Sequence, residues 1–315
     1  MNHNINSGYG AALAKALHGM VPVTGKLRIV GDSGTANLDM IKEMFVPDPD
    51  GQVRFFSTLN AAKSACTANA GDVILVAPGH AEAVTATSID IDVAGITIVC
   101  MGNKENQAVF TFGAAASTIK IDAANVRWIG GNFRANFLDV ASAFTLATAP
   151  GFSVEKASFE DNSSILNFLS CLTTSAVDNE ADDFSFVDNS IYGLNTTPLA
   201  VVSILAATLR PIVSRNYASL AATSGGEFIT LAAKVVLGAR FQDNIHNIVG
   251  ATGTTTGIFL TGSGTSKGIV SGNLVSSLDT TTELITTAGT GLVFFENYYT
   301  GTADKSGKLF PAVDA

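Results

Sequence analysis

Asparagine recurs along most of this chain at nearly constant spacing. Each copy follows a short apolar run and usually a small or acidic residue, as in Met-Gly-Asn, Glu-Asp-Asn and Phe-Glu-Asn. The intervals between neighbouring copies are 29, 30, 27, 27, 28, 29 and 24 residues. Such a sustained period is typical of a solenoid in which each repeat forms one coil. The series consists of Asn103, Asn132, Asn162, Asn189, Asn216, Asn244, Asn273 and Asn297.

Asparagine suits a corner between two strands. Its side chain tolerates positive φ better than most, so it is favoured where the backbone turns sharply. If successive copies stack at one corner, their amides are expected to hydrogen-bond from coil to coil. We therefore interpret the series as a structural ladder.

Short runs of β-forming residues precede these corners in two sets. The set directly before the asparagines is continuous in apolar residues, whereas the earlier set often alternates apolar with polar residues, as half-buried strands do. We expect each coil to contain strand, short turn, strand and Asn corner, followed by a variable arm such as residues 193–195. The two sets include residues 96–99, 126–129, 184–187 and 235–237, and residues 118–121, 144–146, 202–205, 228–231, 257–260 and 284–286.

Composition supports a folded all-β chain. Hydrophobic residues make up 47% of the sequence and charged residues only 14%, which favours a well-buried core over disorder. The formal net charge of −9 provides no positive field for nucleic acid or an anionic membrane, so we predict neither as a partner. No apolar run is long enough to span a bilayer, and no export signal is evident at the N-terminus.

The chain ends differ in character from the repeats. Short helices are expected at residues 11–17 and 38–45, and a further helix is indicated by the spacing of Leu59, Ala62 and Cys66, with Ser57 or Thr58 as its N-cap. We predict that this last helix caps a right-handed parallel β-helix of about eight coils. The expected division is an attachment segment at residues 1–56, the β-helix at 57–300 and a tail at 301–315.

Acidic residues beside the asparagines are the main candidates for chemistry. Polysaccharide-cleaving β-helix enzymes need clustered Asp or Glu, as an acid/base pair or to hold Ca²⁺. Asp161 and Asp188 precede asparagines on successive coils, and Asp243 lies two coils beyond Asp188, so stacking would bring like charges together and raise one pKa. We interpret them as solvated carboxylates, and the same holds for nearby Glu180, Asp182 and Asp183.

Other chemistry-bearing residues fit no known motif. The histidines, His3, His18, His80 and His246, are far apart, and no Cys or His pair has metal-ligand spacing. The sequence therefore predicts no metal, no cofactor and no catalytic residue.

Glycine, tryptophan and cysteine are assigned structural roles. The pairs Gly130-Gly131 and Gly225-Gly226 lack the context of phosphate loops, so we expect turns. Trp128 lies in an expected strand, and the 19 Phe point to an aromatic core. Cys66, Cys100 and Cys171 are odd in number and widely spaced, which favours free thiols.

One resemblance bears on function. Residues 58–102, with a helix, Gly71-Asp72, an apolar strand and Pro78-Gly79, look like the N-terminal end of pectate-lyase-like right-handed β-helices. Residues 23–26, 46–51 and 71–82 resemble β-helix proteins encoded among tailed-bacteriophage structural genes. The resemblance implies a virion component assembled in the host cytoplasm, often a homotrimer, and it carries over no catalytic motif.

Two functions follow as expectations. The first is a non-enzymatic capsid decoration or cement protein, whose partners are the major capsid protein or other virion proteins. The alternative is a tailspike-like protein that binds or cleaves host surface polysaccharide.

Overall fold

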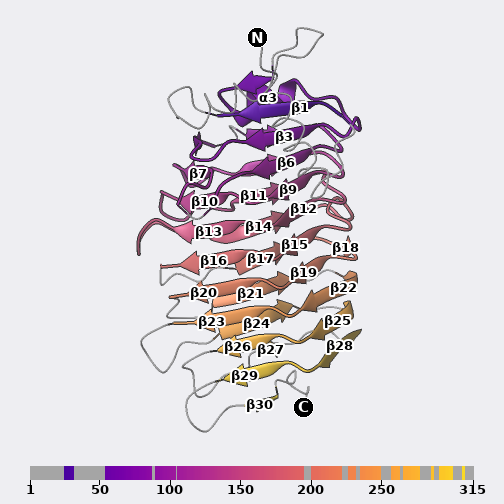
Figure 1. Ribbon diagram of the computed structural model, residues 1–315. Coiled ribbons are helices and arrows are strands. Elements are labelled where there is room, and N and C mark those ends of the chain that lie inside the picture. The colour runs from indigo at the N-terminus through magenta and orange to yellow at the C-terminus, as the bar shows by residue number, and fades with distance from the viewer. Residues whose placement is uncertain are drawn as a thin grey trace, which may run out of the picture.

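The chain winds into a parallel β-solenoid in this computed structural model, which describes residues 25–31, 54–86, 89–103, 105–194, 200–221, 226–231, 235–249, 257–262, 265–276, 285–286, 291–300 and 307–308 (Figure 1). The only helix in these ranges is short. Most coils contribute one strand to each of three sheets, here called A, B and C, in that order along the chain. The predicted all-β parallel β-helix is confirmed, whereas its handedness and coil number stay predictions.

Sheet A is the largest of the three. Its strands pair in parallel, so corresponding residues of successive coils lie side by side. The sheet contains β2 (Phe55–Phe56), β1 (Leu27–Val30), β3 (Val73–Val76), β6 (Thr97–Cys100), β9 (Arg127–Ile129), β12 (Ser153–Glu155), β15 (Ser185–Val187), β19 (Ile212–Ser214), β22 (Val236–Gln242), β25 (Lys267–Ser271) and β28 (Gly291–Phe295), with β18 (Thr208–Leu209) paired to β22.

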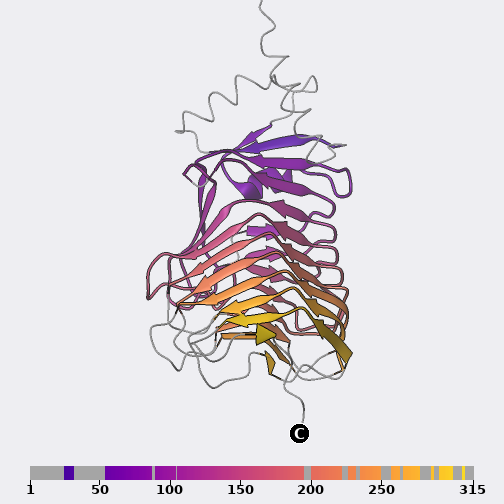
Figure 2. The ribbon, with the colours of Figure 1, turned by 60° about the horizontal axis from the view of Figure 1, so that its bottom comes forward.

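Sheets B and C complete each coil, and Figure 2 shows the coils stacked along the axis. Sheet B contains β4 (Ala81–Val84), β7 (Val109–Phe112), β10 (Asn132–Ala135), β13 (Ser158–Asp161), β16 (Ser190–Gly193), β20 (Tyr217–Leu220), β23 (Ile245–Ile248), β26 (Leu274–Ser276), β29 (Tyr298–Thr300) and the antiparallel β30 (Gly307–Lys308). Sheet C contains β5 (Ile89–Ile91), β8 (Ile119–Ile121), β11 (Phe144–Leu146), β14 (Ser170–Thr174), β17 (Ala200–Ile204), β21 (Gly226–Leu231), β24 (Gly257–Gly262) and β27 (Ile285–Thr286).

The two predicted sets of strands are those of sheets A and C, but the sequence analysis missed sheet B. The expected variable arm after each Asn is instead a third strand, and Gly193 is the last residue of β16. Several of these strands were missed because polar or small residues make up most of their length, as in the Asn-Phe-Arg-Ala of β10 and the Ser-Phe-Glu-Asp of β13. Residue 195 lies outside the described residues.

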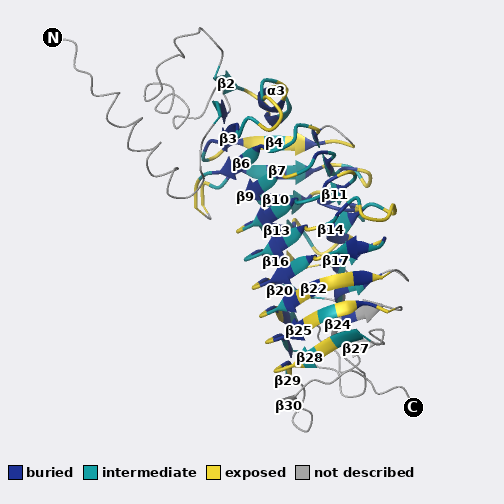
Figure 3. Ribbon diagram, turned by 90° about the vertical axis from the view of Figure 1, so that its right-hand side faces the viewer, coloured by how far each residue is buried: buried dark blue, intermediate teal, exposed yellow. Residues whose placement is uncertain are grey.

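Aromatic rings stack from coil to coil in the interior. Phe133 lies between Phe110 and Phe159 of the neighbouring coils, with ring centroids 5.4 and 5.0 Å apart and interplanar angles of 13° and 22°. Trp128 is fully buried beside them, and its indole N–H donates to the carbonyl of Gly130 at 3.1 Å. Figure 3 shows the resulting alternation of buried and less buried residues along the strands. The predicted aromatic core is therefore confirmed.

The asparagine ladder forms over the C-terminal coils. Asn189, Asn216, Asn244, Asn273 and Asn297 are buried, and each occupies the position directly before a strand of sheet B. The amide of each donates to the side-chain oxygen of the next, at 3.1, 2.9, 3.0 and 2.8 Å along the series. The ladder ends where the backbone N–H of Ala157 donates to Asn189.

The first three asparagines of the predicted series lie elsewhere. Asn132 is the first residue of β10, Asn162 follows the end of β13, and Asn103 is in an exposed loop. The prediction was wrong for these three residues because the intervals vary between 24 and 30 residues. An asparagine that lies a few residues away from the ladder position therefore still fits the period.

The conformational reason given for asparagine was also wrong. The left-handed conformation belongs to the residue before it: φ is +57° at Asp188, +55° at Arg215 and +56° at Asp243. Asn is needed at the corner because its amide donates twice and its carbonyl accepts, which satisfies buried backbone groups of adjacent coils.

The described N-terminal part contains the predicted helix. It is α3 (Leu59–Ser64), whose N-cap Thr58 accepts from the N–H of Ala61 at 3.3 Å. Leu59 and Ala62 are buried in the core, while the capping role of the helix stays a prediction. β1 falls inside the predicted attachment segment, yet it pairs with β3 in sheet A.

Several expectations fall on other parts of the chain. The helices predicted at residues 11–17 and 38–45, and His3 and His18, lie outside the described residues. Within those described, no helix is long and apolar enough to cross a membrane.

Candidate functional site

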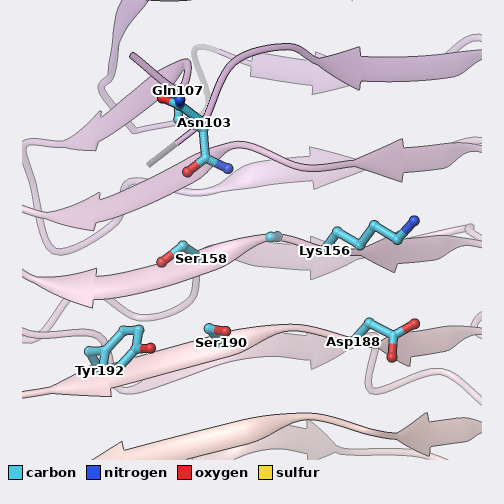
Figure 4. Close-up of a pocket in the computed structure, with 8 residues that line it drawn as sticks. Asn103, Gln107, Lys156, Ser158, Asp188, Ser190 and Tyr192 are labelled. Carbon is cyan, nitrogen blue, oxygen red and sulfur yellow. The ribbon is translucent and has the colours of Figure 1, made fainter. Parts of the chain in front are cut away.

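A groove of about 310 Å³ lies on the outside of the solenoid, where sheet A turns into sheet B. Figure 4 shows that its side chains come from two successive coils and from the loop above them. Most of these side chains are polar or charged, and Tyr192 is the one aromatic residue among those that line the groove. The groove is lined by Asn103, Gln107, Lys156, Ala157, Ser158, Asp188, Ser190 and Tyr192.

The solenoid register places these side chains together. Ser158 pairs with Ser190 across β13 and β16, and both alternate with core residues, so they point outward. Lys156 and Asp188 occupy the corner that precedes each of these strands, with φ of +56° and +57°. A one-residue change in register would turn Ser158 and Ser190 inward.

Tyr192 and Tyr217 form an exposed aromatic pair beside the groove. Their rings lie on adjacent strands of sheet B, with centroids 6.1 Å apart and planes inclined by 52°. Each is well exposed, at 43% for Tyr192 and 36% for Tyr217. An exposed ring with a hydroxyl tip combines apolar contact area with hydrogen bonding, which suits ligands with both characters.

Charge alternates along the corner of the groove. Lys156, Asp188, Arg215 and Asp243 occupy equivalent left-handed positions on successive coils. Arg215 donates from Nε and Nη2 to the two carboxylate oxygens of Asp188, at 2.7 and 2.9 Å. Lys156 has no ion pair among the described residues, so its ammonium is available to a ligand.

The structure does not bring Asp161 and Asp188 together as the sequence analysis considered. Asp161 ends β13 and is buried, where it accepts from the backbone N–H of Phe168 at 3.2 Å and of Leu194 at 2.8 Å. Asp188 lies at the corner beside Arg215 instead. The expected stacking of Asp161 and Asp188 was therefore wrong, because the two acidic residues precede asparagines at different places in the coil. The interpretation of Asp161 as a solvated carboxylate was also wrong, because its side chain is buried and accepts from backbone N–H groups.

The further acidic residues lie at the other end of sheet A and have separate structural partners. Glu180 accepts from the hydroxyl of Ser175 at 2.6 Å, and Asp182 accepts from the N–H of Leu209 at 2.9 Å. Asp183 accepts from Arg210, whose proximity holds the pKa of Asp183 below its ordinary value. These residues add nothing to the groove.

The described histidines are buried and apart. His80 lies against Phe110, and its Nε2 is 3.1 Å from the carboxylate of Glu82. His246 packs edge-on against Phe228 at 5.4 Å. Among the residues that the structure describes, no group of three or more His, Cys, Asp or Glu is placed to hold a metal ion.

The cysteines and the first glycine pair have the predicted structural roles. Cys66, Cys100 and Cys171 are free thiols, and burial raises the pKa of each. Gly130 and Gly131 form a turn with φ of +76° and +94°.

The prediction for the second glycine pair is not confirmed. The predicted turn is wrong for Gly226, which is the first residue of β21. Gly225 lies outside the described residues.

Sequence analysis did not find Lys156, Tyr192 or Tyr217 as site residues. The available signal was the alternation of sheet B, in which Tyr192 and Tyr217 occupy outward positions. Because the sheet itself was not predicted, their common face was not evident.

No protein-family model matches the chain. No curated protein matches it either. Among solved structures, it is similar to a mutant tailspike protein of E. coli bacteriophage HK620 in complex with a pentasaccharide, at 13% identity and a TM-score of 0.52. The match covers 93% of this chain and 63% of the tailspike chain, so this chain spans less than two thirds of that protein. At this identity the likeness establishes a shared fold, the parallel β-solenoid.

Proposed function

We propose that this protein is a bacteriophage virion component of the tailspike type, which binds host surface polysaccharide in the groove between sheets A and B. The observation that carries the proposal is the exposed Tyr192–Tyr217 pair beside a polar groove. The likeness to a tailspike with a bound pentasaccharide supports it.

The groove has the chemistry that a sugar chain requires. A sugar ring presents C–H groups that pack on an aromatic face, and hydroxyls that need hydrogen-bond partners. Tyr192 provides the aromatic face, while Ser158 and Ser190 provide hydroxyls beside it. The amides of Asn103 and Gln107 extend the polar wall on the opposite side.

We propose binding without hydrolysis. A glycosidase needs one carboxylic acid that is available to donate a proton. Beside the groove, Asp188 is bound by Arg215, and Glu160 accepts from Arg134 at 2.7 Å and from Asn132 at 2.9 Å. Incubation with host polysaccharide should therefore leave its chain length unchanged, and shortening of the chains would overturn this part of the proposal.

This function is preferred to capsid decoration. Both functions place the chain in the virion, in contact with other virion proteins. Both are also compatible with the homotrimer that the sequence resemblance to tailed-bacteriophage β-helix proteins implies. The tailspike described above has a similar fold, and the groove offers a surface for sugar.

The test measures binding of host surface polysaccharide to the full-length chain and to Tyr192→Ala. The variant should bind about tenfold more weakly, or worse, because the loss of aromatic and hydrogen-bonding contact costs roughly 1–2 kcal/mol. Tyr298→Ala is the matched control, since Tyr298 is similarly exposed at 45% on β29 of the same sheet. Equal loss in both variants, or no binding by the full-length chain, would overturn the proposal.

A further inference from the structure

A second cavity, of about 200 Å³, opens at the corner where the chain turns into sheet A, the opposite end of that sheet from the groove. It is lined by Asp183, Arg210, Ile212, Gly238 and Arg240. Two guanidinium groups and one carboxylate leave this cavity with a net positive charge, although the whole chain carries −9.

Arg210 is held in place by Asp183. Its Nε and Nη2 donate to the two carboxylate oxygens, each at 2.6 Å, so one edge of the guanidinium is occupied. The same side chain is 60% exposed, and its remaining N–H groups have no partner among the described residues. A guanidinium fixed on one edge presents its other donors with little loss of conformational entropy.

Arg240 differs from its counterparts on the solenoid surface. Arg127, Arg134 and Arg215 each form an ion pair with a carboxylate of the neighbouring coil. Arg240 is exposed and has no carboxylate within ion-pair distance among the residues described. Its position beside Ile212 is fixed by the sheet register, and its N–H donates to the carbonyl of Pro211 at 2.9 Å.

Gly238 keeps the space beside Arg210 open. It has φ of +72°, and a Cβ added there would lie 3.2 Å from Cγ of Arg210. Its coil equivalents Asp183 and Arg210 both carry side chains at this corner, with φ of +59° and +51°. The glycine therefore removes a side chain at the point where the cavity opens between the two arginines.

We propose that this cavity binds a small oxyanion, a carboxylate or phosphate group, between Arg210 and Arg240. Guanidinium groups bind such anions through paired N–H donors. Asp183 orients Arg210 and also reduces the affinity, because its negative charge repels the ligand. The site is separate from the groove and requires neither its tyrosines nor its sugar.

The experiment titrates the full-length chain with inorganic phosphate and with glucuronate, using glucose as the uncharged comparison, and follows the heat of binding. At least one anion should bind saturably and glucose should not. The stronger of the two anions identifies whether phosphate or carboxylate is preferred.

Three variants locate the site. Arg240→Gln should weaken binding about tenfold or more, as expected for loss of a charged hydrogen-bonding partner. Asp183→Asn should strengthen it, because the amide oxygen can still accept a hydrogen bond from Arg210 while the negative charge that repels the anion is removed. Arg127→Gln is the matched control: it removes one positive charge from the same outward column of sheet A, where Arg127 is bound by Glu155 at 2.7 Å.

Binding within twofold of the unsubstituted chain is expected for Arg127→Gln. Absence of saturable anion binding, an equal loss in Arg127→Gln and Arg240→Gln, or weaker binding in Asp183→Asn would overturn the proposal.

Discussion

The side-chain amide of Asn216 donates to the side-chain oxygen of Asn244 on the next coil, at 2.9 Å. Its second N–H donates to the carbonyl of Phe186 at 2.8 Å, and its own oxygen accepts from the backbone of Asn189. One buried side chain thus satisfies polar groups on both neighbouring coils, the preceding one and the following one. Unpaired groups of this kind are costly in a protein interior.

The ladder predicts a strong position dependence of asparagine substitutions. Asn216→Ala should lower the free energy of unfolding by about 2–4 kcal/mol, since it leaves several buried groups without partners. Asn162→Ala is the control, because Asn162 is exposed and, among the described residues, its side chain bonds only to Asn136. Its cost should stay within about 0.5 kcal/mol. Chemical denaturation measures both, and similar losses would contradict the structural assignment.

The aromatic column predicts a large cost for shortening one ring. Phe133→Ala removes a side chain stacked between Phe110 and Phe159, and should destabilise the fold by about 3–5 kcal/mol. Phe137→Ala provides a comparison, since that ring is 44% exposed. The two midpoints of thermal unfolding should differ clearly, and coincident midpoints would argue against a stacked core.

An ion pair on the sheet C face predicts a pH-dependent contribution to stability. Lys120 lies 2.6 Å from Asp122 and holds the pKa of that carboxyl below its ordinary value of 3.8. The contribution is therefore present above the unfolded pKa and is lost as pH falls through the lower, folded pKa.

The variant Asp122→Asn tests this sign. It should be less stable than the unsubstituted chain at pH 7, by under about 1 kcal/mol because the pair is partly exposed. The two chains should converge in acid. Unfolding curves at neutral and acidic pH would show this, and a difference that grows in acid would contradict it.

The thiols should be unreactive in the folded chain. Burial, with a smaller contribution from Asp72, raises the pKa of Cys66 to about 11, and burial also raises the pKa of Cys100 and Cys171. A thiol reagent at pH 8 should therefore react slowly before unfolding and with all three cysteines in denaturant. Rapid labelling of the native chain would show that a thiol is accessible.

The repeat, most strands of sheet C, several strands of sheet A and the helix at residues 59–64 could be predicted from the sequence alone. These features depend on local composition: β-forming runs such as 126–129, a cap at Thr58 and a recurrent asparagine each act within one turn or one coil.

The neighbours that residues of different coils meet could be identified only in the folded chain. Asp161 and Asp188 have similar sequence contexts, yet one ends a strand of sheet B and the other precedes one. Tyr192 meets Tyr217, and Arg210 meets Asp183, because parallel pairing sets a register that no single coil contains. Contacts between coils depend on the exact length of each turn, and a difference of one residue moves a side chain to the opposite face of the sheet.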